Sequence, residues 1–106
     1  MDKKKVYEAL DISMLKDWLN TSFREVGISS LELLANDKVI DKAAERAYKK
    51  IPKFPYRAIL KATIGEEGFT QLVYKIRDGM LKRKSIEFEW LTVDTLKKLL
   101  SEIKKE

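Results

Sequence analysis

The stretch EEGFTQLVYKIRDGMLKR, which runs from Glu66 to Arg83, decides the fold class of this 106-residue chain. Its large apolar residues recur every three or four positions, the repeat that places side chains on one face of an α-helix. These residues are Phe69, Leu72, Val73, Ile76 and Met80. Glu66 and Glu67 stand where the positive end of such a helix stabilises negative charge. The pattern therefore predicts an amphipathic helix that begins near Glu66 and fades around Arg83.

A second amphipathic helix is predicted near the start of the chain. It begins near Asp11 or Ser13 and ends at Gly27, the residue type that most often follows a helix end. Its apolar positions share one face at 3.6 residues per turn. They are Met14, Leu15, Trp18, Leu19, Phe23 and Val26. We expect Trp18 and Phe23 to lie in the core. Residues 3–10 are a candidate for a separate short helix.

The middle of the chain predicts two or three further helices. Ser29 and Glu32 have the spacing of a capping box that opens a helix. An apolar stripe continues to residue 51, and the helix either bends at residues 36–37 or a new helix starts at Asp37 or Asp41. Two prolines then mark a short non-helical joint, because the residue before each proline disfavours the α region. Pro55 fits the first position of a helix that runs to residue 65.

Residues 85–92, with the sequence SIEFEWLT, follow a different repeat. Ile86, Phe88 and Trp90 alternate with two glutamates, which is the period of a half-buried strand. No strong partner strand exists, and residues 38–40 are the only weak candidate. Three interpretations remain open. The segment is an extended arm whose aromatic side chains plug the helical core, or it pairs with its own copy or another protein, or it is a helix that resembles a strand.

A last helix, capped by Thr92 or Asp94, is indicated by four apolar residues at helical spacing. They are Leu96, Leu99, Leu100 and Ile103. The chain has no repeat and no linker, and 106 residues suffice for one domain. We therefore predict a single all-α or nearly all-α domain over residues 1–106. It is a compact bundle of about four to six short helices with one short extended segment near residues 85–92.

The composition excludes several kinds of catalytic site. The chain has no cysteine and no histidine, so thiol nucleophiles, histidine-based triads and Cys/His zinc sites are absent. Asp37, Asp41 and Glu45 share a helix face, as magnesium ligands would, but lysines and an arginine interleave with them. Ordinary ion pairs four residues apart explain that pattern. We therefore expect no enzyme activity, no cofactor, no metal and no small-molecule substrate, and a carboxylate-dependent magnesium enzyme is the least favoured hypothesis.

The distribution of apolar residues bears on localisation. No apolar run approaches the ~18 residues of a membrane-spanning helix, and the charged start is not followed by the apolar core of a signal peptide. The sequence thus predicts a cytoplasmic protein without a membrane span.

Positive charge is concentrated in one part of the chain. Residues 49–84 hold ten Lys or Arg and three acidic residues, which gives this region a net charge of +7. The rest of the chain has a net charge of −2, so the whole chain has +5. A basic region of this kind is an electrostatic footprint for nucleic acid. The candidate residues are Lys75, Arg77, Lys82, Arg83 and Lys84, together with Lys49, Lys50 and Lys53. On a helix, however, the residues of the 75–84 region border the apolar stripe on both sides and form no single exposed face.

These observations favour a non-enzymatic binding or regulatory protein that acts through protein–protein contact. Ile86, Phe88 and Trp90 are the candidate partner-binding residues, and the occupant is a protein partner or a second copy in a homodimer. The alternative is a basic nucleic-acid-binding protein that uses the 75–84 region. Affinity for nucleic acid that falls steeply with salt would distinguish the second hypothesis from the first.

Overall fold

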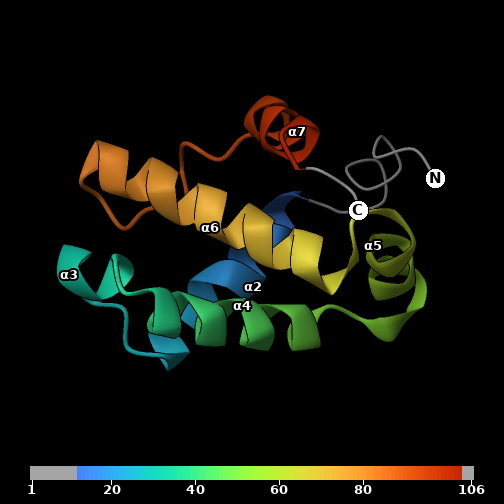
Figure 1. Ribbon diagram of the computed structural model, residues 1–106, viewed down its shortest axis with the longest axis horizontal. Coiled ribbons are helices and arrows are strands. Elements are labelled where there is room, and N and C mark those ends of the chain that lie inside the picture. Colours follow the sequence, from blue (N-terminus) through green and yellow to red (C-terminus); the bar gives the residue numbers. More distant parts are fainter. Residues whose placement is uncertain (1–11, 104–106) are drawn as a thin grey trace.

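The longest helix among the described residues is α6 (Gly65–Arg83), which lies along the length of the bundle (Figure 1). The structure is a computed structural model, and it describes residues 12–103. The helix begins one residue before Glu66 and ends at Arg83, and its five predicted stripe residues are at most 1% exposed. The helix predicted from the spacing of these residues is therefore confirmed.

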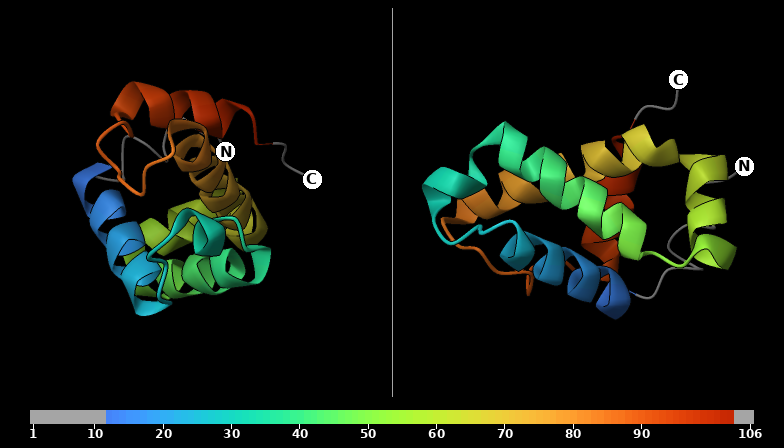
Figure 2. Two further views of the ribbon diagram at one scale, coloured as in Figure 1. Left: turned by 90° about the vertical axis from the view of Figure 1, so that its left-hand side faces the viewer. Right: turned by 90° about the horizontal axis from the view of Figure 1, so that it is seen from below.

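Helices α2 (Ile12–Glu25) and α4 (Asp37–Lys50) lie on one side of α6, with α2 packed on α4 and α4 packed on α6 (Figures 1 and 2). Leu15, Leu19 and Phe23 of α2 are buried, but Trp18 is only partly buried, so its predicted place in the core is wrong in part. The reason is angular. At ~100° per residue, Ser22 stands nearer the middle of the buried face than Trp18 does.

Two side-chain caps separate the helices of the middle region. Ser30, not Ser29, caps the four-residue helix α3 (Leu31–Leu34), and its hydroxyl accepts a hydrogen bond from the Leu33 N–H at 3.2 Å. Asn36 then caps α4, because its side-chain oxygen accepts hydrogen bonds from the N–H groups of Lys38 and Val39 at 3.0 and 3.2 Å. The alternative in which a new helix begins at Asp37 is therefore the one observed. Residues 38–40 are helical and cannot serve as a partner strand.

The two prolines produce the predicted joint, but the helix after it is shorter than expected. Residues Lys53–Arg57 form a wide helical turn, η1, in which Phe54 has extended backbone angles of φ −135° and ψ 134°. The regular helix α5 (Ala58–Thr63) begins only after this turn. Gly65 follows with φ 72°, a conformation that costs glycine little. The joint therefore changes the chain direction and places α5 at one end of the molecule (Figure 1).

Helix α7 (Val93–Ser101) lies against α6 on the side away from α4 (Figure 2). Thr92 caps it as predicted, by accepting a hydrogen bond from the Thr95 N–H at 3.2 Å. Leu96, Leu100 and Ile103 are buried, which joins α7 to the common core.

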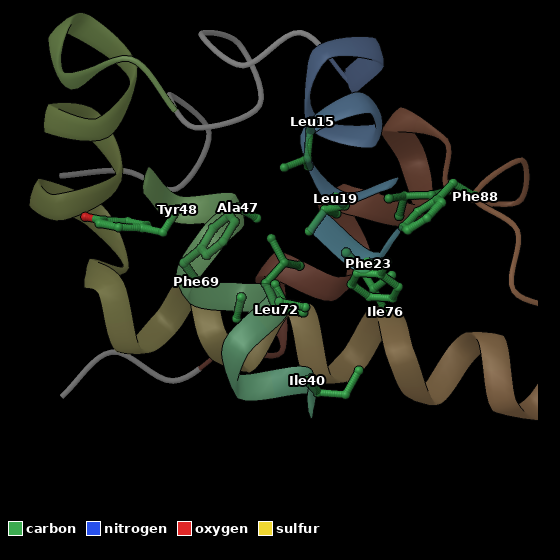
Figure 3. Close-up of a cluster of buried hydrophobic side chains, with 14 of the residues drawn as sticks. Leu15, Leu19, Phe23, Ile40, Ala47, Tyr48, Phe69, Leu72, Ile76 and Phe88 are labelled. Carbon is green, nitrogen blue, oxygen red and sulfur yellow. The ribbon is translucent and has the colours of Figure 1, made fainter. Parts of the chain in front are cut away.

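The helices share one hydrophobic core, in which side chains of α2, α4 and α6 meet (Figure 3). Residues 12–103 contain six α-helices and no strand, so the predicted all-α compact bundle is confirmed. Residues 85–92 connect α6 to α7 without forming a helix. The short helix predicted at residues 3–10 lies outside the described residues. In the part of the chain that the structure describes, no helix has the length and apolar character needed to cross a membrane.

A candidate protein-binding groove

Residues 85–92, which we call the arm, run from the end of α6 to the start of α7. Phe88 and Leu91 are buried at 9% and 0% exposure, whereas Ile86 and Trp90 are partly buried. The alternating pattern predicts that Ile86, Phe88 and Trp90 point the same way and are largely buried. This prediction is confirmed for Phe88 only, because a turn at residues 89–90 interrupts the alternation. The geometry of this chain corresponds to the arm interpretation.

Phe88 attaches the arm to α2. Its ring meets the ring of Phe23 edge-on, with 5.3 Å between centroids and 67° between planes (Figure 3). This arrangement is one that aromatic pairs prefer, and it adds about 0.5–1.5 kcal/mol to the gain from burial. Phe88 therefore has a structural role in the monomer, whatever contacts its exposed edge makes.

Trp90 attaches the arm to α6. Its indole ring lies so close to Gly79 that a Cβ atom there would stand 2.5 Å from the ring carbon Cη2. The guanidinium of Arg83 lies 4.3 Å from the ring centroid, and the indole Nε1–H donates to the carbonyl of Glu87 at 2.8 Å. Trp90 is therefore held by its own chain through its ring and through its polar edge.

A surface groove lies between the arm and α2. It has a volume of about 530 Å³ and is lined by Lys16, Asp17 and Asn20 on one side and residues 86–89 on the other. Ile86 and Phe88 supply its apolar surface, and its charged residues are one lysine and three acids, a net −2. The whole chain has net charge +5, so this groove is locally acidic on a basic molecule.

The arm also leaves backbone donors open. Within residues 12–103, the amide N–H groups of residues 86–90 have no protein acceptor. The neighbouring amides differ, since the Ser85 N–H donates to the carbonyl of Met80 and the Leu91 N–H to that of Phe88, at 3.1 and 3.0 Å. Unpaired backbone groups of an irregular segment are satisfied by water or by an extended chain laid beside them.

The basic residues of the 75–84 region are not gathered on one surface. Arg77 is only 9% exposed, and Lys75 forms a salt bridge with Glu102 of the C-terminal region at 3.2 Å. Arg83 lies over Trp90. Lys82 and Lys84 are exposed and contact no acidic side chain in the described part of the chain. Of the five candidates in the 75–84 region, two therefore remain as cations without a side-chain partner among the described residues.

Two carboxylates of α4, Asp37 and Asp41, bond to side chains of α6, which sequence spacing did not predict, whereas Glu45 pairs with Lys49 four residues along α4, as that spacing indicated. Arg77 donates to Asp37 at 2.9 Å and to Asp78 at 2.8 Å, and Tyr74 donates to Asp41. The hydrogen bond to Asp41 raises the pKa of Tyr74 to about 12, assisted by burial and nearby negative charge. Among residues 12–103 no group of three acidic side chains is arranged to hold a metal ion.

A second hollow, of about 580 Å³, lies between α4 and the start of α6. The residues that line it are all polar or charged, namely Asp41, Glu45, Lys49, Glu66, Glu67 and Thr70. Like the groove beside the arm it is acidic, but no aliphatic or aromatic residue lines it.

The chain was compared with protein-family models, with curated proteins and with solved structures, and none of them matches it. The geometry of the groove is therefore the basis for a functional assignment.

Proposed function

We propose that this protein is a non-enzymatic binding module that recognises an apolar, positively charged segment of another protein in the groove between α2 and the arm. The observation that carries the proposal is the composition of this groove. It combines an apolar surface from Ile86 and Phe88 with acidic groups from Asp17, Glu87 and Glu89.

The chemistry of the occupant follows from these walls. An apolar side chain gains free energy by leaving water against Phe88, at roughly 25 cal/mol for each Å² buried. Lysine or arginine beside it meets the acidic rim, which contributes more to specificity and association rate than to affinity. The N–H groups of residues 86–90 have no acceptor among residues 12–103, so those that face the groove are available to carbonyl groups of a bound chain.

Selection from a random peptide library displayed on phage tests the proposal. We expect the purified protein to enrich peptides in which an aromatic or large aliphatic residue is flanked by Lys or Arg. The double substitution Glu87→Lys with Glu89→Lys should weaken the binding of such a synthetic peptide by about tenfold or more at ~0.15 M salt, because it reverses the rim charge.

The second acidic hollow supplies a matched control. Glu66→Lys with Glu67→Lys makes the same change in net charge at the start of α6, in two residues that line the second hollow and not the groove. Peptide affinity should stay within about twofold of the wild type in this variant, because exposed charges outside the binding site are screened by salt. Equal loss in both variants would mean that binding follows net charge alone, and the groove would then be rejected as the site.

A further inference from the structure

Phe54 projects from the surface at the joint between α4 and α5. Its side chain is 84% exposed, the highest exposure among the large apolar residues that the structure describes. Prolines stand at positions 52 and 55, and each fixes its own φ angle, so the backbone around this ring is restrained before any partner arrives. A restrained backbone leaves less conformational entropy to lose on binding, which suits this segment to present an aromatic anchor.

The surroundings of Phe54 are positively charged. Residues 46–65 contain six Lys or Arg and no acidic residue. Arg46 and Lys50 pair with Glu25, and Lys49 pairs with Glu45. Lys53 and Lys61 contact no acidic side chain among residues 12–103. We call the adjacent Lys53 and Phe54, together with Lys61 of the helix α5 that follows them, the basic knob.

We propose that the basic knob of one copy binds the groove between α2 and the arm of a second copy, so that the chain assembles head to tail. The inference rests on the proposed function, because it names the protein segment that the groove receives. The two surfaces are complementary in both respects on which that function depends. The Phe54 ring is apolar and the groove has an apolar wall from Ile86 and Phe88, while the charges of Lys53 and Lys61 are opposite to those of the acidic rim.

The positions of the two surfaces determine the kind of assembly. The knob lies by α5 at one end of the long axis of 37 Å, and the arm leaves α6 at the other end (Figure 1). Different surfaces of the two copies therefore meet. Such a heterologous contact leaves one knob and one groove free in every open complex, so the assembly extends into chains until it closes into a ring. A symmetric dimer formed by pairing of two arms would have neither property.

Sedimentation velocity over a concentration series tests this inference. The wild type should show a sedimentation coefficient that rises with protein concentration up to about 0.5 mM, the range in which small contacts become populated. The rise should diminish between ~0.05 and ~0.5 M salt, because the charged groups are exposed to solvent. Phe54→Ser should sediment as a monomer throughout, while Leu31→Ser, which removes an exposed apolar side chain of α3, should behave as the wild type.

Mixing two defective variants provides the decisive measurement. Phe54→Ser lacks the knob and keeps the groove, and Glu87→Lys with Glu89→Lys lacks the groove and keeps the knob. Each should be monomeric alone. Their equimolar mixture should form a 1:1 complex that grows no further, because neither partner has both functional surfaces.

Three results would overturn head-to-tail assembly: a wild type that stays monomeric up to ~0.5 mM, a Phe54→Ser variant that still assembles, or a mixture that stays monomeric. The peptide selection above separates this failure from failure of the proposed function. A groove that binds library peptides while the wild type stays monomeric has a different protein as its partner. A groove that binds neither refutes both proposals.

Discussion

The contact between Trp90 and Gly79 allows a quantitative prediction for the substitution Gly79→Ala. Helix propensity favours the substitution, and steric overlap with the Trp90 ring opposes it. Gly79 lies inside α6, where alanine is favoured over glycine by about 1 kcal/mol. The new Cβ atom would stand only 2.5 Å from the Trp90 ring. The ring cannot move away freely, because Arg83 lies over it and its Nε1–H donates to the Glu87 carbonyl.

The effect of Gly79→Ala on the unfolding free energy should have opposite signs in the wild type and in the Trp90→Ala variant. Overpacking by one methyl group costs about 1–3 kcal/mol, so Gly79→Ala should lower the unfolding free energy of the wild type by about 1 kcal/mol after the gain in helix propensity. Without the indole the clash disappears. Gly79→Ala should therefore raise the unfolding free energy of Trp90→Ala by about 1 kcal/mol, and the coupling energy of the double-mutant cycle should be about 2 kcal/mol.

The unfolding free energies of all four proteins are measured by urea unfolding, followed by far-ultraviolet circular dichroism. Tryptophan fluorescence is unsuitable, because the Trp90→Ala variants lack one of the fluorophores. A Gly79→Ala variant that is stabilised by about 1 kcal/mol in both backgrounds would show that the indole does not pack on α6. The docking of the arm described above would then be wrong.

Three further predictions concern the arm and the paired charges. Phe88→Glu should abolish the far-ultraviolet helical signal, because losing the packed ring costs about 3–5 kcal/mol and a buried charge adds to that cost. Tyr74 should ionise near pH 12 in a spectrophotometric titration, and Asp41→Asn should return its pKa toward 10. Arg77→Met should lower the unfolding free energy by only about 1–2 kcal/mol, since Asp37 and Asp78 are exposed and regain water.

Each of these expectations has a contrary outcome. A folded Phe88→Glu monomer would place the ring at an interface and not in the core. The raised pKa of Tyr74 implies that its stabilising effect is complete below about pH 10 and is lost as the pH rises through about 12, so stability that is constant over that range contradicts the hydrogen bond. A loss above about 3 kcal/mol in Arg77→Met would mean that the guanidinium supports the core itself.

The sequence predicted those parts of the fold that depend on neighbours along the chain. The stripe of α6 and the Thr92 cap are local patterns, and the structure confirms both. The errors arise where two local signals compete. Ser29 and Ser30 both suit a helix start, and the choice between them depends on how the short helix α3 meets α4.

Contacts between distant segments could not be predicted in this way. Arg77 and Asp37 are forty residues apart, and each has a nearer residue of opposite charge in the sequence. Helical spacing placed Arg77 on a flank of the stripe, but it cannot show that α3 and α4 cover that flank. One signal was available for Trp90, since a glycine in a helix interior often marks a close approach by another group.

The sequence predicted only one of the two sides of the groove, namely the side formed by the arm. Phe88 belongs to an alternating pattern, so its burial was predicted from the arm alone. Lys16, Asp17 and Asn20 lie on the polar side of an amphipathic helix, where such residues need no special explanation. Their part in the site exists only because the Phe88 ring rests against Phe23 and brings the arm alongside α2. The groove is therefore a product of one aromatic contact, and a change that displaces Phe88 should remove the groove together with the fold of the arm.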